Sequence, residues 1–367
     1  VNGGFNYASY LDVLERDRMN LTRVFLVAYR ESSQTTPSLT PLSMPAAQYV
    51  QPWQRTSSGG EALDGLGKWD FSTWNEDYFS RLKDFVNECS RHGVVAELTL
   101  FGTYYTENHW LISPFNPSNN IQGSGPTNRH DCYRPGNGGQ LPVQEAGVPR
   151  ITRELNAYDN WYFSIQNEPF WNQPGVKDDE EVAFHDAILG YIRDEESTLP
   201  NRHLVAHNFP QMAGSFSGNY DVLNEHYPAA VPGTTIAGAE NLLQNHYSGG
   251  KILALDETDT PSPVTARLEA WMFTHGGGAI YNGLNFVNLV YTSENESGDT
   301  PVGNALRETV REMGTYLDNL ALTDLRRDLS WITSGLPSGA RLQSMSSPGQ
   351  QYVAYLHHGQ DGQTNLQ

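Results

Sequence analysis

The sequence predicts an α/β protein whose main domain, residues 1–325, is a parallel (β/α)8 TIM barrel, with part of a small β domain over residues 326–367. Three observations lead to this prediction. The 367 residues suit one barrel-sized domain and a small appendage. From about residue 8 to residue 320, short apolar runs alternate with longer helical patterns, the order typical of a parallel sheet covered by helices. After residue 328, Ser, Gly and Pro increase, and the alternating run 351–356 indicates antiparallel strands.

Seven apolar runs have the length and composition of β-strands. The clearest is Val94–Phe101, because an apolar run with few charges predicts a strand covered on both faces. The predicted strands are Leu21–Ala28, Val94–Phe101, Trp161–Gln166, Asn201–His207, Tyr220–His226, Lys251–Asp256 and Ala279–Asn285. The predicted helices are Tyr7–Arg18, Trp74–His92, Val143–Asn156, Asp179–Thr198, Ala237–Asn245, Thr265–His275 and Asn304–Leu320.

A closed barrel of this type needs eight strands, one more than these runs supply. We expect the missing strand to precede the first helix, unless a short strand has been overlooked. A barrel without it has two open edges, which favour aggregation, so truncation of the sequence at its start is one explanation. The β-rich tail stops at Gln367 without a clear terminus and is expected to be incomplete too.

Acidic residues dominate the charge of the chain. Lysine and arginine total 23 against 42 aspartate and glutamate residues, a net charge of −19. Such a field repels phosphate backbones and anionic lipids, so nucleic acid and membrane surfaces are not expected partners. No run approaches the roughly 18 apolar residues that a membrane span needs.

Other bulk features leave questions open. No signal peptide is visible, and we expect a secreted or periplasmic protein, with a cytoplasmic location as the alternative. Cys89 and Cys132 form one disulfide or none, and the sequence does not determine the oligomeric state.

Two predicted strands lead directly into a glutamate. One ends in Asn167, Glu168 and Pro169, where proline stops the strand and leaves the two preceding side chains at its carboxyl end. The strand Lys251–Asp256 leads into Glu257 in the same way. Active sites of these barrels are built at the carboxyl ends of the strands, so we expect both glutamates to line one cleft.

A pair of glutamates in one cleft suits the cleavage of a glycosidic bond with retention of configuration. One carboxyl group, here Glu168, donates a proton to the leaving oxygen, while the other, Glu257, is ionised about 5–5.5 Å away and attacks the anomeric carbon. Repulsion between neighbouring carboxylates raises the pKa of one of them, which lets it act as an acid near neutral pH. Arg23 and Tyr227 are the candidates for keeping the second carboxylate ionised.

These residues resemble those of glycoside hydrolase clan A, and within it the family 5 cellulase-like enzymes. The matching features are Asn167-Glu168-Pro169 after strand four, Glu257 after strand seven, Arg23 on strand two and Glu225-His226-Tyr227 on strand six. The resemblance implies that Glu168 is the acid/base and Glu257 the nucleophile. It also implies that Asn167 binds the hydroxyl next to the reacting carbon and that Tyr227 donates a hydrogen bond to the nucleophile.

The sequence departs from the clan pattern at two places. The clan commonly has His and Tyr two positions apart on strand six, whereas His226 and Tyr227 are adjacent, which leaves Glu225 or a bulged His226 as the inward neighbour. The tryptophan often found at the end of the last strand is absent, and Asn285 or Phe286 is expected there.

Aromatic rings are expected to stack on the apolar faces of sugar rings. Trp171, three residues past Glu168, is the first candidate. Further candidates at and after the third strand of the clan pattern are Phe101, Tyr104, Tyr105 and Trp110, and Asn285 is expected to contact substrate as well. The loop of about forty residues from Thr103 to Pro142 is long enough to be functional, as a wall or a cap of the cleft.

The leading hypothesis is an endo-acting β-glycan hydrolase, similar to a cellulase, with cellulose-like, mannan-like and xylan-like chains all open as substrates. An exo-acting β-glycosidase on oligosaccharides and a non-catalytic carbohydrate-binding barrel are the alternatives. His207, His226 and His275 suggest a metal site, but the paired spacing typical of histidine ligands is absent, so no metal or cofactor is expected.

Overall fold

The computed structural model describes residues 3–27, 30, 45–135, 141–169, 179–209, 219–226, 235–258, 263–283 and 301–357. The chain divides into two compact units. Unit 1 is built mainly from Asn20–Tyr220, and unit 2 mainly from Asp221–Tyr291 and Ser297–Gln367. Helix α1 (Tyr7–Arg16) begins in unit 1 and ends in unit 2.

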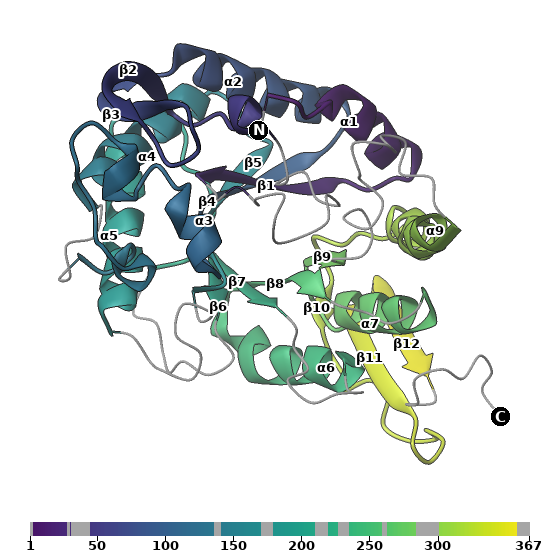
Figure 1. Cartoon of the computed structure of the whole chain (residues 1–367). Helices are drawn as coiled ribbons and strands as arrows, with labels where there is room; N and C mark the ends of the chain where they lie inside the picture. Colours follow the sequence, from purple (N-terminus) through teal and green to yellow (C-terminus); the bar gives the residue numbers. More distant parts are fainter. Residues whose placement is uncertain are drawn as a thin grey trace. The chain divides into compact units, whose positions relative to one another are not determined.

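Unit 1 contains four parallel strands with helices between them (Figure 1). The strands pair in the order β1 (Leu21–Val27), β4 (Val95–Gly102), β5 (Trp161–Asn167) and β6 (Val205–Phe209). The intervening helices are α2 (Glu76–Arg91), α4 (Leu141–Leu155) and α5 (Asp179–Glu196). Every residue of β5 is buried, as are all but the first of β4, which confirms the prediction of strands covered on both faces.

Helix α2 shows how local sequence sets the bounds of an element. The side chain of Asn75 accepts a hydrogen bond from the backbone N–H of Tyr78 and caps the first turn. At the other end Gly93 has φ +67°, and the N–H of Val94 donates to the carbonyl of Cys89. This is a Schellman ending, which a glycine in the left-handed region makes possible. The predicted helix was therefore correct in place and too long by a residue or two at each end.

The segment between β1 and α2, which is rich in Pro, Ser and Gly, contains a hairpin that the sequence did not predict. Strands β2 (Trp53–Glu61) and β3 (Gly67–Trp74) pair in antiparallel fashion, with register shifts that mark irregular pairing. Much of β2 is exposed and lacks alternating apolar residues, so no strand periodicity was visible. The short helix α3 (Glu107–Leu111) lies in the long loop after β4.

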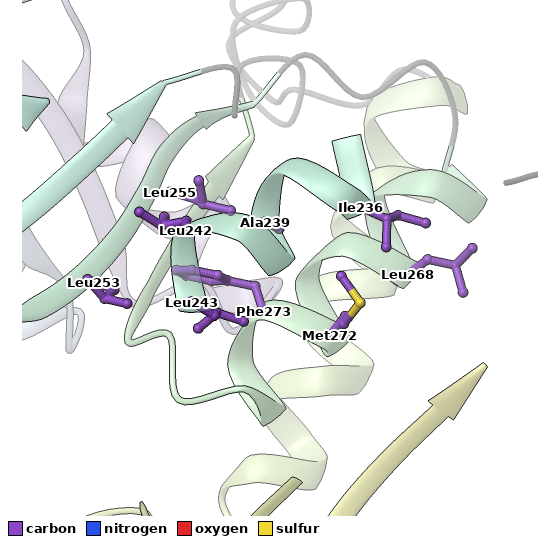
Figure 2. Close-up of a cluster of buried hydrophobic side chains, with 9 residues drawn as sticks. All are labelled: Ile236, Ala239, Leu242, Leu243, Leu253, Leu255, Leu268, Met272 and Phe273. Carbon is purple, nitrogen blue, oxygen red and sulfur yellow. The ribbon is translucent and has the colours of Figure 1, made fainter. Parts of the chain in front are cut away.

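Unit 2 contains the other three parallel strands in the order β7 (Val222–His226), β8 (Ile252–Thr258) and β9 (Ile280–Gly283). Helices α6 (Thr235–His246), α7 (Pro263–His275) and α9 (Pro301–Leu317) alternate with or follow them. Figure 2 shows the core in which side chains of α6 and α7 pack with those of β8. Its members are Ile236, Ala239, Leu242, Leu243, Leu253, Leu255, Leu268, Met272 and Phe273.

The tail forms an antiparallel sheet, as the alternating pattern predicted. Its strands are β10 (Arg326–Arg327), β11 (Arg341–Ser347) and β12 (Gln351–His357), paired in that order. The sheet belongs to unit 2, and Tyr355 of β12 packs against the core shown in Figure 2. Whether residues 326–367 form a domain of their own stays a prediction.

All seven predicted parallel strands occur in the part of the chain that the structure describes, each within a few residues of its expected bounds. Closure into an eight-stranded barrel stays a prediction. No helix among the described residues combines the length and apolar character needed to cross a bilayer. Cys89 and Cys132 are both buried with free thiols, which resolves the alternative left open by the sequence.

Candidate functional site

Glu168 follows directly after β5 and has an unusual backbone. Its φ is +49°, in the left-handed region, and among the described non-glycine residues only Arg18 shares this feature. The residue is 5% exposed. A left-handed residue with a Cβ costs roughly 1–2 kcal/mol, so a buried glutamate held there marks a candidate functional position.

Three hydrogen bonds hold this backbone. The hydroxyl of Thr103 lies 2.7 Å from the carbonyl oxygen of Asn167 and 3.0 Å from that of Glu168, and it donates to both. The N–H of Glu168 donates to Oδ1 of Asn208 at 3.0 Å. Thr103 and Asn208 are fully buried, so these bonds form away from water.

The carboxyl group of Glu168 is held by the loop after β4. The hydroxyl of Tyr105 donates to Oε2 of Glu168, and Nδ2 of Asn167 donates to the same Tyr105 oxygen at 2.8 Å. The guanidinium of Arg23 on β1 donates to Oδ1 of Asn167. A directed chain of hydrogen bonds therefore runs from Arg23 through Asn167 and Tyr105 to Glu168.

Arg23 is itself fixed by the strand register. It lies opposite Glu97 in the pairing of β1 with β4, and its Nε donates to Oε1 of Glu97 at 3.2 Å. Tyr162, opposite Glu97 on β5, donates to the other carboxylate oxygen at 2.7 Å. Both groups of the ion pair are almost fully buried, and the additional hydrogen bond helps to offset the cost of desolvating the carboxylate.

A second layer of buried polar groups lies behind the carboxyl end of β5. Nε2 of Gln166 donates to the Thr103 hydroxyl at 3.0 Å and to Oε1 of Glu181 at 3.1 Å, and Oε1 of Gln166 lies 2.9 Å from Nε2 of His185. The Nδ1 atoms of His185 and His207 are 3.2 Å apart. Burial lowers the pKa of His185 to about 3 and also lowers that of His207 well below its usual value, so both rings are neutral near neutral pH.

Unit 2 positions the second predicted glutamate. Oε2 of Glu257 lies 3.3 Å from Nδ1 of His226, and Nε2 of His226 lies 2.7 Å from Oδ1 of Asp256. Asp256 in turn accepts a hydrogen bond from the side chain of Asn224. His226 thus lies between two carboxylates and within ion-pair distance of each.

A bulge produces this arrangement. The pairing of β7 with β8 shifts between Glu225 and His226, so that His226 lies opposite Glu257 instead of Asp256. Of the two inward neighbours left open by the sequence, His226 is the one that contacts Glu257. Burial raises the pKa of Glu225 to about 7, although the nearby His226 opposes the shift.

Three aromatic side chains predicted to bind sugar are part of the core. Phe101, Tyr104 and Trp110 are 2%, 1% and 2% exposed. Phe101 and Tyr104 pack on Tyr133, and Trp110 packs edge-on against Tyr104. A stacking platform needs an open ring face, which these buried rings lack in the described structure, and their binding of sugar stays a prediction. Sequence shows aromatic area but not which ring faces are covered.

The remaining predicted site residues cannot be placed. Trp171, Tyr227 and Asn285 lie outside the described residues. The structure adds contacts that sequence reasoning missed, above all those of Tyr105, Thr103 and Asn208 with Glu168. Thr103 and Asn208 were marked in the sequence only by their place just after predicted strands, whereas Tyr105 was expected to stack on sugar and not to bond Glu168.

Comparisons with known proteins show what this fold resembles. A family model described as a domain of unknown function, DUF6298, matches residues 44–129. No curated protein matches the sequence. A protein of Bacteroides vulgatus ATCC 8482 assigned as a glycoside hydrolase has a TM-score of 0.59 at 15% identity, covering 92% of this chain and 59% of its own. The fold of this chain is therefore similar to that of the Bacteroides vulgatus protein.

Two further solved structures agree. A glycoside hydrolase family 5 protein from Bacteroides vulgatus ATCC 8482 has a TM-score of 0.55 at 12% identity, with 93% of this chain and 71% of that chain covered. An exo-β-1,4-mannosidase from Opitutaceae bacterium strain TAV5 has a TM-score of 0.53 at 13% identity, with 84% of this chain and 56% of that chain covered. The chain thus spans less than two thirds of the first structure and of the mannosidase. At these identities the similarity concerns the fold alone.

Proposed function

We propose that this protein is a retaining glycoside hydrolase that cleaves β-glycosidic bonds within a plant-type polysaccharide, with Glu168 as the acid/base and Glu257 as the nucleophile. The observation that carries the proposal is the fixed geometry of Glu168. A buried carboxyl group at a strand end, held in a left-handed backbone and bonded by Tyr105, is pre-oriented for proton transfer. A fold shared with glycoside hydrolases supports the same assignment.

In the first step the Glu168 carboxyl donates its proton to the glycosidic oxygen as the bond to the anomeric carbon breaks. The Glu257 carboxylate forms a covalent bond to that carbon. In the second step Glu168, now ionised, accepts a proton from water, whose oxygen displaces Glu257 and releases the sugar. The mechanism requires the two carboxyl groups to approach within about 5–5.5 Å in the substrate complex.

The other residues have defined roles in the proposal. Asn167 presents an oriented amide because Arg23 and Tyr105 fix both of its ends. An amide nitrogen carries two N–H groups, so one remains to donate to the hydroxyl beside the reacting carbon. His226, whose Nδ1 lies 3.3 Å from Oε2 of Glu257, has the role of orienting the nucleophile in this proposal. A net charge of −19 favours a neutral or cationic substrate, and an uncharged glycan meets this condition.

The decisive experiment replaces Glu168 by Ala and adds azide. A retaining enzyme assayed on an aryl β-glycoside with an activated leaving group should regain turnover and yield the β-glycosyl azide, because azide occupies the space of the lost carboxylate and attacks the covalent intermediate. Glu257→Ala should abolish that intermediate and show no such rescue. Glu312→Ala, which removes an exposed carboxylate of α9, is the matched control and should behave as the wild type.

Failure is equally clear. Full activity in both Glu168→Ala and Glu257→Ala would show that the proposed catalytic site is wrong. Sugar binding without turnover in the wild type would favour a carbohydrate-binding barrel. Products released from soluble β-glucan, mannan and xylan separate internal cleavage from trimming of chain ends.

A further inference from the structure

The backbone of Glu168 is a strained element that must be held by its surroundings. The left-handed conformation is disfavoured by the contact of Cβ with the following carbonyl oxygen. Conformations of this kind persist only where neighbouring groups over-determine them. At Glu168 the neighbouring groups are identifiable, because its N–H and its carbonyl each have a buried side-chain partner.

Thr103 is well suited to hold two adjacent peptides. A hydroxyl carries one hydrogen, and this one lies within hydrogen-bond distance of the carbonyl oxygens of both Asn167 and Glu168. A shared hydrogen bond of this type fixes the direction of two consecutive carbonyls, which restricts the φ and ψ rotations of Glu168 that lie between them. Asn208 then accepts a hydrogen bond from the N–H of Glu168, which is on the other side of the peptide that contains the Asn167 carbonyl.

The support behind Thr103 is a network of buried, hydrogen-bonded side chains. Gln166 donates to the Thr103 oxygen, which leaves the hydroxyl hydrogen to the two carbonyls. Gln166 is itself bonded to Glu181 and His185, all buried. Burial lowers the pKa of His185 to about 3, so this ring stays neutral near neutral pH.

The geometry points to Thr103 and Asn208 as positioning residues that hold the backbone of Glu168 in its left-handed conformation and so direct the acid/base carboxyl group toward the leaving oxygen. This inference rests on the proposed function. Thr103 begins the long loop after β4, and Tyr105 two residues later bonds the same carboxyl group. One short segment therefore holds both the backbone and the side chain of Glu168.

The competing explanation is that Thr103 and Asn208 only stabilise the fold. Substrates that differ in their leaving group distinguish the two explanations. Proton donation by Glu168 matters for a poor leaving group such as phenol and little for 2,4-dinitrophenol, which departs without it. A misdirected acid therefore lowers kcat/KM selectively for the phenyl glycoside. Partial unfolding lowers kcat/KM for both substrates by the same factor.

The test compares Thr103→Val, which keeps the shape and removes the hydroxyl, with Thr103→Ser, which keeps the hydroxyl. Both are assayed on phenyl and 2,4-dinitrophenyl β-glycosides of a sugar that the wild type hydrolyses. Thr103→Val should lose about tenfold to a hundredfold in kcat/KM on the phenyl glycoside, the size expected for a misplacement near 1 Å, and less than about threefold on the other. Thr103→Ser should recover most of the loss.

Thr152→Val is the matched control. The Thr152 hydroxyl is also fully buried in unit 1 and donates to a backbone carbonyl, that of Val148 in α4, at 2.8 Å. This variant should lose about as much stability as Thr103→Val while leaving the ratio of the two kcat/KM values unchanged. If Thr103→Val does not fold, Asn208→Ala removes the other support and should show the same selectivity.

Equal losses on both substrates, or no loss, in the folded variants would overturn the inference. Glu168→Ala, assayed in parallel, separates this result from failure of the proposed function. If Glu168→Ala loses phenyl glycoside activity and Thr103→Val does not, only the positioning role is wrong. If Glu168→Ala retains that activity, Glu168 is not the acid, and both the proposed function and the inference fall.

Discussion

Replacing Glu168 by Gly should leave the protein more stable than replacing it by Ala. Both substitutions remove the carboxyl group and its bond to Tyr105, so they differ only in the Cβ atom and in backbone freedom. At φ +49° the Cβ of alanine costs roughly 1–2 kcal/mol, which glycine avoids. Glycine loses about 0.5–1 kcal/mol more backbone entropy on folding. The difference favours Gly by about 1 kcal/mol.

At a helical position the stability difference between Gly and Ala should have the opposite sign. Asn87 is exposed in the middle of α2, in the same unit, and there Ala should be more stable than Gly by about 1 kcal/mol because glycine is a poor helix former. The two comparisons together should therefore differ by about 2 kcal/mol. Taking the difference between the two pairs cancels the extra backbone entropy of glycine in the unfolded state, because this entropy is the same at both positions.

Urea unfolding followed by circular dichroism measures these differences from the transition midpoints, provided that the slopes m agree among the variants. The reasoning is refuted if Ala is the more stable residue at both positions. That result would mean that Glu168 does not adopt a left-handed backbone in solution. Thr103 and Asn208 would then have no strained backbone to hold.

Three further outcomes follow from the described contacts. Tyr105→Phe should lower kcat/KM on the phenyl glycoside about tenfold or more, because it removes the hydroxyl that fixes the direction of the Glu168 carboxyl group, and a misplacement near 1 Å can cost about a hundredfold; unchanged steady-state kinetics would contradict this. Burial lowers the pKa of His185 to about 3, so its contribution to the free energy of unfolding is full above pH 6.5 and is lost as the pH falls from there toward 3. His185→Gln should reduce the slope of unfolding free energy against pH in this range by up to about 1.4 kcal/mol per pH unit. A slope equal to that of the wild type would contradict the lowered pKa. Arg307→Leu should cost about 1–3 kcal/mol, less than the loss of every partner of a buried carboxylate, because Asp17 keeps its two hydrogen bonds from Arg16. The double variant with Asp17→Asn should be more stable than the single one, and denaturant titration of both checks this.

Much of the fold could be predicted because its signals are local. The run Val94–Phe101 is mostly apolar with Glu97 as its one charged residue, which indicates a strand covered on both faces, and the structure has β4 at this place with both faces covered. Helix α2 has its cap, its apolar face and its glycine ending within twenty residues of sequence. The hairpin of β2 and β3 escaped prediction because its exposed Ser and Gly residues have no periodicity, and its order comes from pairing.

The candidate site divides in the same way. Glu168 and Glu257 were found because each directly follows a short apolar run, which is a property of a few adjacent residues. The contacts around Glu168 were not predicted, since Thr103, Tyr105 and Asn208 are 40 to 65 residues away and no pattern in the chain links them to it.

The sequence by itself determined which residues end the strands and that a pair of glutamates is among them. Only the tertiary structure decided that Glu168 has a left-handed backbone, that a bulge brings His226 opposite Glu257, and that Phe101, Tyr104 and Trp110 are core residues. The physical reason is range. Hydrophobic periodicity and chain stops act over neighbouring residues, whereas backbone strain, register shifts and the covering of an aromatic face depend on partners that folding brings from elsewhere in the chain.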